Sequence, residues 1–199
     1  MKRLAVLISN AGTGTNLQAM INAIRDGRLT AQIVAVISDT EGAYGIVRAK
    51  NSGLPVKIIA KADDLLPYLL AVQPDYICLA GWKQLVLPGV VAVYKDRILN
   101  IHPGLVPDTN SGTVKNPDGT TGLWNQHKLA GKAIQNFLDR TATYGGSSLH
   151  FLTDEIDFGP VLGRCFEKIR PGDTVETFYA RLKKKENKLY VKSLITLCK

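Results

Sequence analysis

The sequence predicts an α/β protein with a doubly wound, mostly parallel sheet flanked by helices, in a single domain of residues 1–199. Short apolar runs alternate with segments of helical periodicity along the first hundred residues. The apolar runs are continuously hydrophobic, as is typical of parallel strands buried on both faces. With 199 residues and 45% hydrophobic content, the chain is long and apolar enough for one sizeable core.

The apolar pattern gives the expected elements in order. Strands are expected at residues 4–8, 33–37, 56–59, 76–80 and 98–101. Helices are expected between them at residues 17–24, 44–49 and 64–72. A helix near 124–138, strands near 147–152 and 161–169, and a final helix should complete the fold. Residues 1–100 would thus form a βαβ half, and residues 101–199 a second half that contains an exposed loop.

Residues 108–122 are rich in Thr, Asn, Gly, Pro and Asp, with turn signals at Asn116-Pro117 and Asp118-Gly119. We therefore expect an exposed loop. It follows the strand that ends near His102, and open α/β sheets bind ligands at the carboxyl ends of their strands. Long loops of this kind often act as lids.

Two short motifs supply groups suited to moving an acyl group. Asn-Ile-His-Pro at 100–103 closes a predicted strand, and Asp-Phe-Gly-Pro at 157–160 precedes another. Because side chains alternate along a strand, Asn100 and His102 should share one face, about 6 to 7 Å apart. With Asp157 they would provide an amide, an imidazole and a carboxylate. A capped strand end with a structural histidine is the alternative.

The turn at residues 9–18 lies between a predicted strand and a predicted helix and contains Gly12 and Gly14 among small polar residues. Thr15 and Gln18 have the spacing of a capping box, so the helix should begin there and offer free N–H groups to a phosphate. The segment matches neither the nucleoside-triphosphate loop nor the dinucleotide motif, which favours a phosphomonoester. A glycine turn needed only for packing is the alternative.

The last helix carries a carboxylate where core is expected. Glu186 lies on the apolar stripe formed by Val175, Phe178, Leu182 and Leu189. A buried carboxylate requires a cation or a polar ligand, and Lys183 lies three residues earlier. A Lys183–Glu186 surface pair at the edge of the stripe is the alternative.

The net charge is +8, and residues 163–199 carry ten Lys or Arg against four Asp or Glu. An acidic ligand near that end is one explanation, and a solvated basic face is the other. The sequence has no zinc-finger spacing, aromatic RNA-binding motif or basic heptad segment, which favours phosphorylated metabolites over nucleic acid.

Cysteine usage and hydropathy indicate the compartment. The three cysteines are far apart and lack a Cys-x-x-Cys spacing, so neither a disulfide framework nor a metal site is expected. No apolar run approaches the roughly 20 residues of a membrane span, and no cleavage pattern follows the first residues. We expect a cytoplasmic protein.

Five stretches together carry a family resemblance. They are Val-Leu-Ile-Ser at 6–9, Asn-Leu-Gln-Ala at 16–19, Leu-Ala-Gly-Trp at 79–82, Leu-Asn-Ile-His-Pro at 99–103 and His-Phe-Leu-Thr-Asp-Glu-Ile-Asp-Phe-Gly-Pro-Val at 150–161. Over nearly its whole length the chain resembles the phosphoribosylglycinamide formyltransferases, folate-dependent enzymes of purine biosynthesis. The resemblance implies a formyltransferase-like Rossmann variant acting on small molecules as a monomer or homodimer.

The implied reaction transfers a formyl group from 10-formyltetrahydrofolate, a co-substrate, to the glycine amine of phosphoribosylglycinamide, without a metal. The implied catalytic residues are Asn100, His102 and Asp157. The implied phosphate and ribose ligands are Gly14, Thr15, Asn16, Lys183 and Glu186. The implied folate-binding residues are Lys83, Gln84, Leu85, Val86, Asn100, Asp154, Glu155, Ile156 and Asp157, with Lys61 for the glutamate tail.

The chain departs from the family pattern at several positions. The phosphate loop is two residues longer, loop 108–122 is longer, and the region 61–66 is shorter. Four residues differ from the usual ones, namely Lys83, Gln84, Gly104 (usually Ser) and Phe158 (usually Gly). Two other function classes stay open. One is a related enzyme, methionyl-tRNA formyltransferase or formyltetrahydrofolate hydrolase, and the other is a non-catalytic phosphometabolite- or RNA-binding module.

Overall fold

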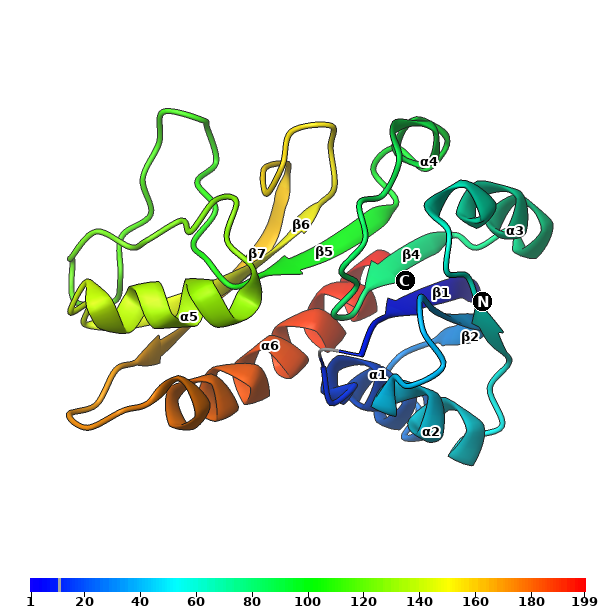
Figure 1. Ribbon diagram of the computed structural model, residues 1–199, viewed down its shortest axis with the longest axis horizontal. Helices are drawn as coiled ribbons and strands as arrows, with labels where there is room; N and C mark the ends of the chain where they lie inside the picture. The colour runs from blue at the N-terminus through cyan, green and yellow to red at the C-terminus, as the bar shows by residue number, and fades with distance from the viewer. Residues whose placement is uncertain (11) are drawn as a thin grey trace. The chain divides into compact units, whose positions relative to one another are not determined.

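A computed structural model describes residues 1–10 and 12–199 of the chain (Figure 1). The chain divides into two compact units, residues 1–100 with 190–199, and residues 101–189. The strand order of its sheet is β3-β2-β1-β4-β5-β6-β7. The α/β class with a mostly parallel sheet flanked by helices is thus confirmed.

The first unit contains the parallel part of the sheet. Its strands are β1 (Lys2–Ile8), β2 (Ala31–Ser38), β3 (Val56–Ile58), β4 (Tyr76–Leu79) and the start of β5 (Ile98–His102). Every pair among them, β1–β2, β1–β4, β2–β3 and β4–β5, is parallel. The strands β1 and β2 are buried along most of their length, which explains their continuous hydrophobicity.

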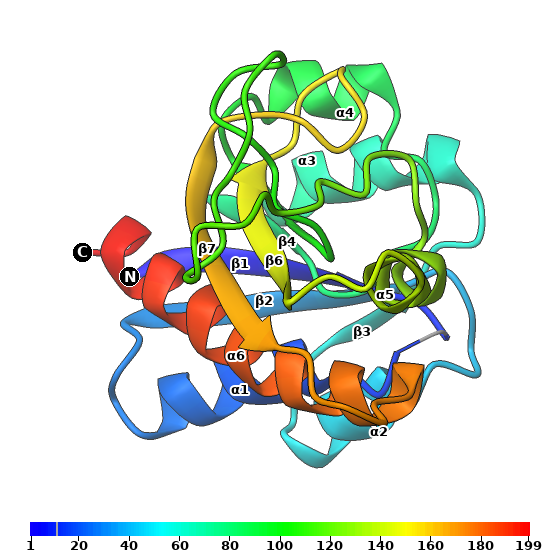
Figure 2. The same cartoon turned by 90° about the vertical axis from the view of Figure 1, so that its left-hand side faces the viewer.

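Helices lie on both sides of these strands. They are α1 (Thr15–Arg25), α2 (Tyr44–Asn51), α3 (Leu65–Val72) and α4 (Pro88–Val93), with a 3-10 turn at Ala62–Asp64 before α3. Figures 1 and 2 show α1 and α2 on one side of the unit's strands and α3 and α4 on the other. The sequence analysis missed α4, a six-residue helix with Pro at its first position and only apolar and Gly residues after it.

The second unit is built around an antiparallel pair. The strands β6 (Tyr144–Phe151) and β7 (Val161–Lys168) pair along their length, and α5 (Ala130–Asp139) packs against β6. The long helix α6 (Val175–Leu197) contributes residues up to Leu189 to this unit. A fully buried cluster joins α5 and α6, and its members are Ile134, Phe137, Phe178 and Leu182.

The prediction of a helix from residue 124 is wrong for its first six residues, because α5 begins at Ala130. Asn125 and His127 have positive φ values of 60° and 62°, which a helix cannot contain. Residues 108–122 form the expected loop without helix or strand, largely exposed except for Asn116, and an isolated bridge joins Lys115 to Thr121.

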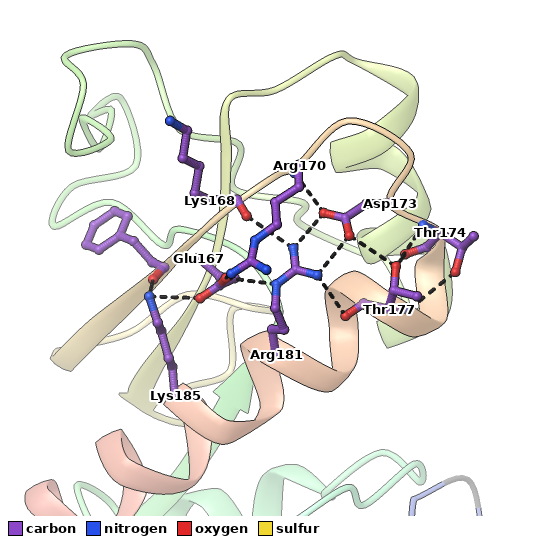
Figure 3. Close-up of polar contacts among 9 residues, drawn as sticks. Glu167, Lys168, Arg170, Asp173, Thr174, Thr177, Arg181 and Lys185 are labelled. Atoms are coloured by element: carbon purple, nitrogen blue, oxygen red, sulfur yellow. Dashed lines mark hydrogen bonds and ion pairs between the residues drawn. The ribbon is translucent and has the colours of Figure 1, made fainter.

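An ion-pair network fastens the start of α6 to β7 (Figure 3). The Arg181 guanidinium contacts Glu167 Oε1 at 3.0 Å and Asp173 Oδ2 at 2.6 Å, and Lys185 Nζ lies 2.9 Å from Glu167 Oε2. Hydrogen bonds from Arg181 hold the pKa of the Asp173 carboxyl well below its usual range. Part of the C-terminal basic charge therefore neutralises carboxylates of the protein itself.

Candidate active site

The structure brings His102 and Asp157 together in the second unit. His102 ends β5, its side chain is 3% exposed, and its Nδ1 lies 3.2 Å from Asp157 Oδ1. The other carboxylate oxygen of Asp157 accepts a hydrogen bond of 2.8 Å from the backbone N–H of His127. Both oxygens of this carboxylate therefore have a protein donor.

The charged state of Asp157 follows from this arrangement. Burial raises the pKa of the carboxyl, but the hydrogen bond and charge of His102, with the His127 amide, outweigh burial and hold the pKa below its usual value. Asp157 has a backbone φ of 54°, in the left-handed region that few non-glycine residues adopt. Such strain is typical of functional sites.

Asn100 lies on the same strand as His102, two positions earlier. It is half-buried and pairs with Leu79 of β4 in the parallel register. Strand alternation therefore gives the two residues the same face of β5. Their common position at the carboxyl end of a parallel strand is where α/β sheets place ligands.

The loop between β6 and β7 contains the other predicted folate residues of this unit. Asp154, Glu155 and Ile156 are exposed, and Ile156 is an apolar side chain 53% exposed. Glu155 Oε2 accepts a hydrogen bond of 3.0 Å from Asn110 Nδ2, so this loop contacts the loop 108–122. An exposed apolar side chain beside backbone polar groups suits a flat heteroaromatic ring.

The predicted phosphate loop lies in the first unit, and Ala11 of this loop falls outside the described residues. The capping-box prediction is wrong, because Gly14 is the N-cap of α1, with φ 69°, and no side chain caps the helix. Gln18 Nε2 instead donates a hydrogen bond to Asn22 Oδ1, and Gln18 Oε1 accepts one of 3.1 Å from Arg48 Nη1. A left-handed N-cap favours glycine, which is why Thr15 moves to the first helical turn.

The first turn of α1 still offers groups to an anion. Within residues 1–10 and 12–199, the buried oxygens Thr15 Oγ1 and Asn16 Oδ1 have no hydrogen-bond partner. Arg48 Nε donates to the carbonyl of Thr13 at 2.8 Å and so braces this loop from α2. The sequence analysis missed Arg48, which no motif marks.

In the second unit, Lys183 and Glu186 of α6 form a buried ion pair. Glu186 is 1% exposed, and its Oε2 lies 2.6 Å from Lys183 Nζ. Its Oε1 accepts a hydrogen bond of 2.6 Å from Ser147 Oγ on β6, a partner that the sequence analysis missed. Burial opposes the charge of Lys183, but Glu186 outweighs it and raises the pKa of the ammonium. The predicted pair forms with its carboxylate in the core and its ammonium 26% exposed, so the alternative of a pair at the surface is wrong for Glu186.

The remaining predicted folate residues lie in the first unit, residues 83–86 after β4 and Lys61 after β3. The Lys83 N–H donates to Ser9 Oγ at 3.0 Å, and Gln84 Nε2 donates to the carbonyl of Ala60 at 3.0 Å. Leu85 is exposed and Val86 is buried. Lys61 lines a pocket of about 560 Å³ together with Lys57 and Tyr68. The lining also includes the carboxylate of Asp64, so the two ammonium groups leave the pocket with one excess positive charge, which favours an anionic ligand.

In the described part of the chain, no group of three His, Cys, Asp or Glu side chains is arranged to hold a metal ion. No helix formed by residues 1–10 and 12–199 is long and apolar enough to cross a membrane.

His150 is a buried polar residue near the His102–Asp157 pair. It is fully buried on β6, and its Nδ1–H donates to the carbonyl of Phe151 at 2.9 Å. Burial lowers its pKa to about 4. The imidazole therefore stays neutral in the folded protein at pH values where it is protonated in the unfolded chain.

We expect this difference to make stability pH-dependent. Between pH 6.5 and about 4 the unfolded state binds one more proton at His150, so the free energy of unfolding falls as the pH falls, by roughly 3 kcal/mol. His150→Asn keeps a donor for Phe151 but cannot titrate. Urea unfolding between pH 4.5 and 7 should therefore show a flatter dependence for His150→Asn than for wild type. Equal slopes would contradict the assignment.

Comparisons with known proteins extend these observations. The formyl transferase family model matches residues 2–194. A phosphoribosylglycinamide formyltransferase of Haemophilus influenzae is 32% identical over 96% of this chain and 84% of its own length. The Escherichia coli protein of the same name is 33% identical over 94% and 82%. The crystal structure of glycinamide ribonucleotide transformylase 1 from Symbiobacterium toebii is similar, with a TM-score of 0.83, 31% identity and coverage of 100% and 88%.

Proposed function

The chain belongs to the formyl transferase family, and from this premise we propose that it transfers a formyl group from 10-formyltetrahydrofolate to the glycine amine of 5'-phosphoribosylglycinamide, in purine biosynthesis. Relatives at about one-third identity carry that enzyme's name. The observation that carries the proposal is the contact of the buried His102, at the carboxyl end of β5, with the partly buried Asp157.

The groups of this pair suit the reaction. The amine nitrogen attacks the formyl carbon and forms a tetrahedral oxyanion, and the bond to the folate nitrogen then breaks as a proton passes from the amine to that nitrogen. The Asn100 amide would donate to the oxyanion, and a protonated His102 would stabilise its charge. Asp157 would stabilise the imidazolium and help move the proton.

The acceptor substrate carries a phosphate and a ribose. Gly14, Thr15 and Asn16 at the first turn of α1 would hold the phosphate with backbone N–H groups and the hydroxyl, supported by the positive end of the helix dipole. Lys183 would add a cation to this binding, and the remaining lone pairs of Glu186 would accept hydrogen bonds from the ribose hydroxyls.

The folate would contact both loops that follow the strands. The backbone of residues 83–86 and of 154–157 would hold the pterin, with Leu85 and Ile156 as exposed apolar contacts. Lys61, beside Lys57, would attract the carboxylates of the glutamate tail. In this assignment residues 1–100 are the phosphate-binding half, with Asn100, Lys61 and residues 83–86 as its folate-side contributions, and residues 101–199 carry His102, Asp157 and the folate loop 154–157. The enzyme would work in the cytoplasm as a monomer or homodimer.

The test is an acceptor-dependent assay with purified wild-type protein. The absorbance change on deformylation of a 10-formyl folate analogue is followed with glycinamide ribonucleotide, with charged initiator tRNA, and with no acceptor. Turnover that requires glycinamide ribonucleotide is expected. Folate loss without an acceptor would show a hydrolase, transfer to tRNA would show the related transferase, and binding without turnover would show a non-catalytic module.

A further inference from the structure

Trp124 is hydrogen-bonded to both members of the His102–Asp157 pair. Its backbone carbonyl contacts His102 Nε2 at 2.9 Å, and its indole Nε1–H donates to the backbone carbonyl of Asp157 at 2.9 Å. Its ring lies 5.7 Å from the ring of Phe158, tilted by 53°. One residue outside the predicted catalytic set thus contacts the imidazole and the backbone that carries the carboxylate.

The contact with His102 restricts the imidazole. Its two ring nitrogens face two acceptors, Asp157 Oδ1 on one side and the Trp124 carbonyl on the other. A neutral imidazole has one N–H and can donate to one acceptor, whereas a protonated imidazole donates to both. Because the ring is almost fully buried, water does not easily replace either partner. The Trp124 carbonyl therefore fixes the orientation of the ring and accepts a hydrogen bond from an Nε2–H.

The contact with Asp157 fixes a strained backbone. The left-handed conformation of Asp157 is unfavourable for a residue with a Cβ atom, and it persists only where its surroundings hold it. The Trp124 indole bonds the carbonyl of Asp157, and the His127 N–H bonds its carboxylate. Trp124 and His127 thus aim the carboxylate at His102.

Gly104 creates the room that this arrangement needs. A Cβ atom at position 104 would overlap the Trp124 carbonyl and lie 2.6 Å from His102 Nε2. Asn125 fixes the other side of the segment, because its Nδ2 donates to the carbonyls of Pro103 and Ala133. Gly104 and Asn125 therefore allow and maintain the close approach of the Trp124 carbonyl to the imidazole.

We propose that Trp124 is a positioning residue for formyl transfer, which holds His102 and Asp157 in their mutual geometry through its carbonyl and its indole. The expected effect on kcat rests on the proposed function. The expected effect on the N–H signals of the His102 ring can be measured without turnover.

The kinetic test compares two variants that each remove one side-chain donor to the loop 154–158. Trp124→Phe keeps an aromatic ring against Phe158 and loses the N–H to Asp157. The matched control Gln126→Leu loses the hydrogen bond of 3.0 Å from Gln126 Nε2 to the carbonyl of Ile156, one residue before Asp157. We expect Trp124→Phe to lower kcat about tenfold with KM for both substrates within about twofold, and Gln126→Leu to retain wild-type kcat.

The second measurement is ¹⁵N NMR of the histidine rings in protein without substrates. The chain has three histidines, so His102 can be assigned with single variants. Wild type should show a slowly exchanging Nε2–H on His102, because this proton is buried and hydrogen-bonded to the Trp124 carbonyl. Trp124→Phe should speed its exchange, and Gly104→Ala, which displaces the Trp124 carbonyl, should abolish the slow signal.

Three results would overturn the proposal. They are a Trp124→Phe variant with wild-type kcat and ring signals, a Gln126→Leu variant with the losses expected of Trp124→Phe, and a wild-type His102 ring without a slowly exchanging Nε2–H. If the ring signals respond as expected but no variant or wild type transfers a formyl group, the proposed function fails and the positioning role of Trp124 stands.

Discussion

Replacing His102 with Asn is expected to lower kcat about 10³-fold. An Asn side chain can place its Nδ2 near the position of the imidazole Nδ1, so a donor to Asp157 is retained. The variant loses the second N–H and the positive charge beside the developing oxyanion. The loss of kcat in this variant therefore measures how much the imidazole stabilises the transition state, separately from its contact with Asp157.

The measurement is single-turnover kinetics with the folate analogue and glycinamide ribonucleotide, alongside equilibrium binding of each substrate. Binding within about threefold of wild type would show that the site is intact, since only transition-state interactions were removed. A His102→Asn variant with kcat within tenfold of wild type would mean that His102 has a structural role, the alternative that the sequence left open.

Glu186→Gln is expected to lower the free energy of unfolding by about 3 kcal/mol, since breaking a buried ion pair leaves an uncompensated charge. The substitution keeps an acceptor for Ser147 but leaves the Lys183 ammonium without its carboxylate. For a chain of this size the change corresponds to a decrease in Tm of roughly 6 to 12 °C. The change in Tm is measured by thermal unfolding, monitored by circular dichroism.

The matched control is Glu176→Gln, an exposed carboxylate in the first turn of the same helix. It removes the same charge from α6 without unpairing a buried partner, and a much smaller change in Tm is expected. Equal losses in the two variants would show that the Glu186 effect comes from the net charge of the helix and not from the buried pair. Adding Lys183→Met to Glu186→Gln should restore part of the stability, because it removes the unpaired ammonium.

The parallel strands were predictable because burial on both faces makes them continuously apolar. The predicted strand at 33–37 lies within β2, Ala31–Ser38, and differs from it by two residues at the start and one at the end. The helix α4 was missed because six residues of Pro, Gly, Val and Ala show no helical periodicity. The start of α5 was wrong because the hydrogen bonds of Asn125, which hold its left-handed backbone, come from residues distant in the sequence.

The site was predictable at the level of residue types. The spacing of Asn100 and His102 indicated two polar side chains on one face at the end of a strand. The position of Glu186 on an apolar stripe indicated a carboxylate in the core. The partners of these groups were not predictable. Ser147 contacts Glu186 and the Trp124 carbonyl contacts His102, and both partners lie in segments without a recognisable sequence motif. A backbone carbonyl in particular is present at every residue, so only the fold shows which one contacts the imidazole.

The left-handed backbone at Asn125, His127 and Asp157 has a consequence for anyone who redesigns this enzyme. These positions admit Gly, Asn, Asp and, less readily, His, while β-branched residues are excluded by their own geometry. A combinatorial library around the site that samples all twenty amino acids at these three positions would consist mostly of misfolded loops. A library restricted to the permitted few would keep the architecture and explore the chemistry.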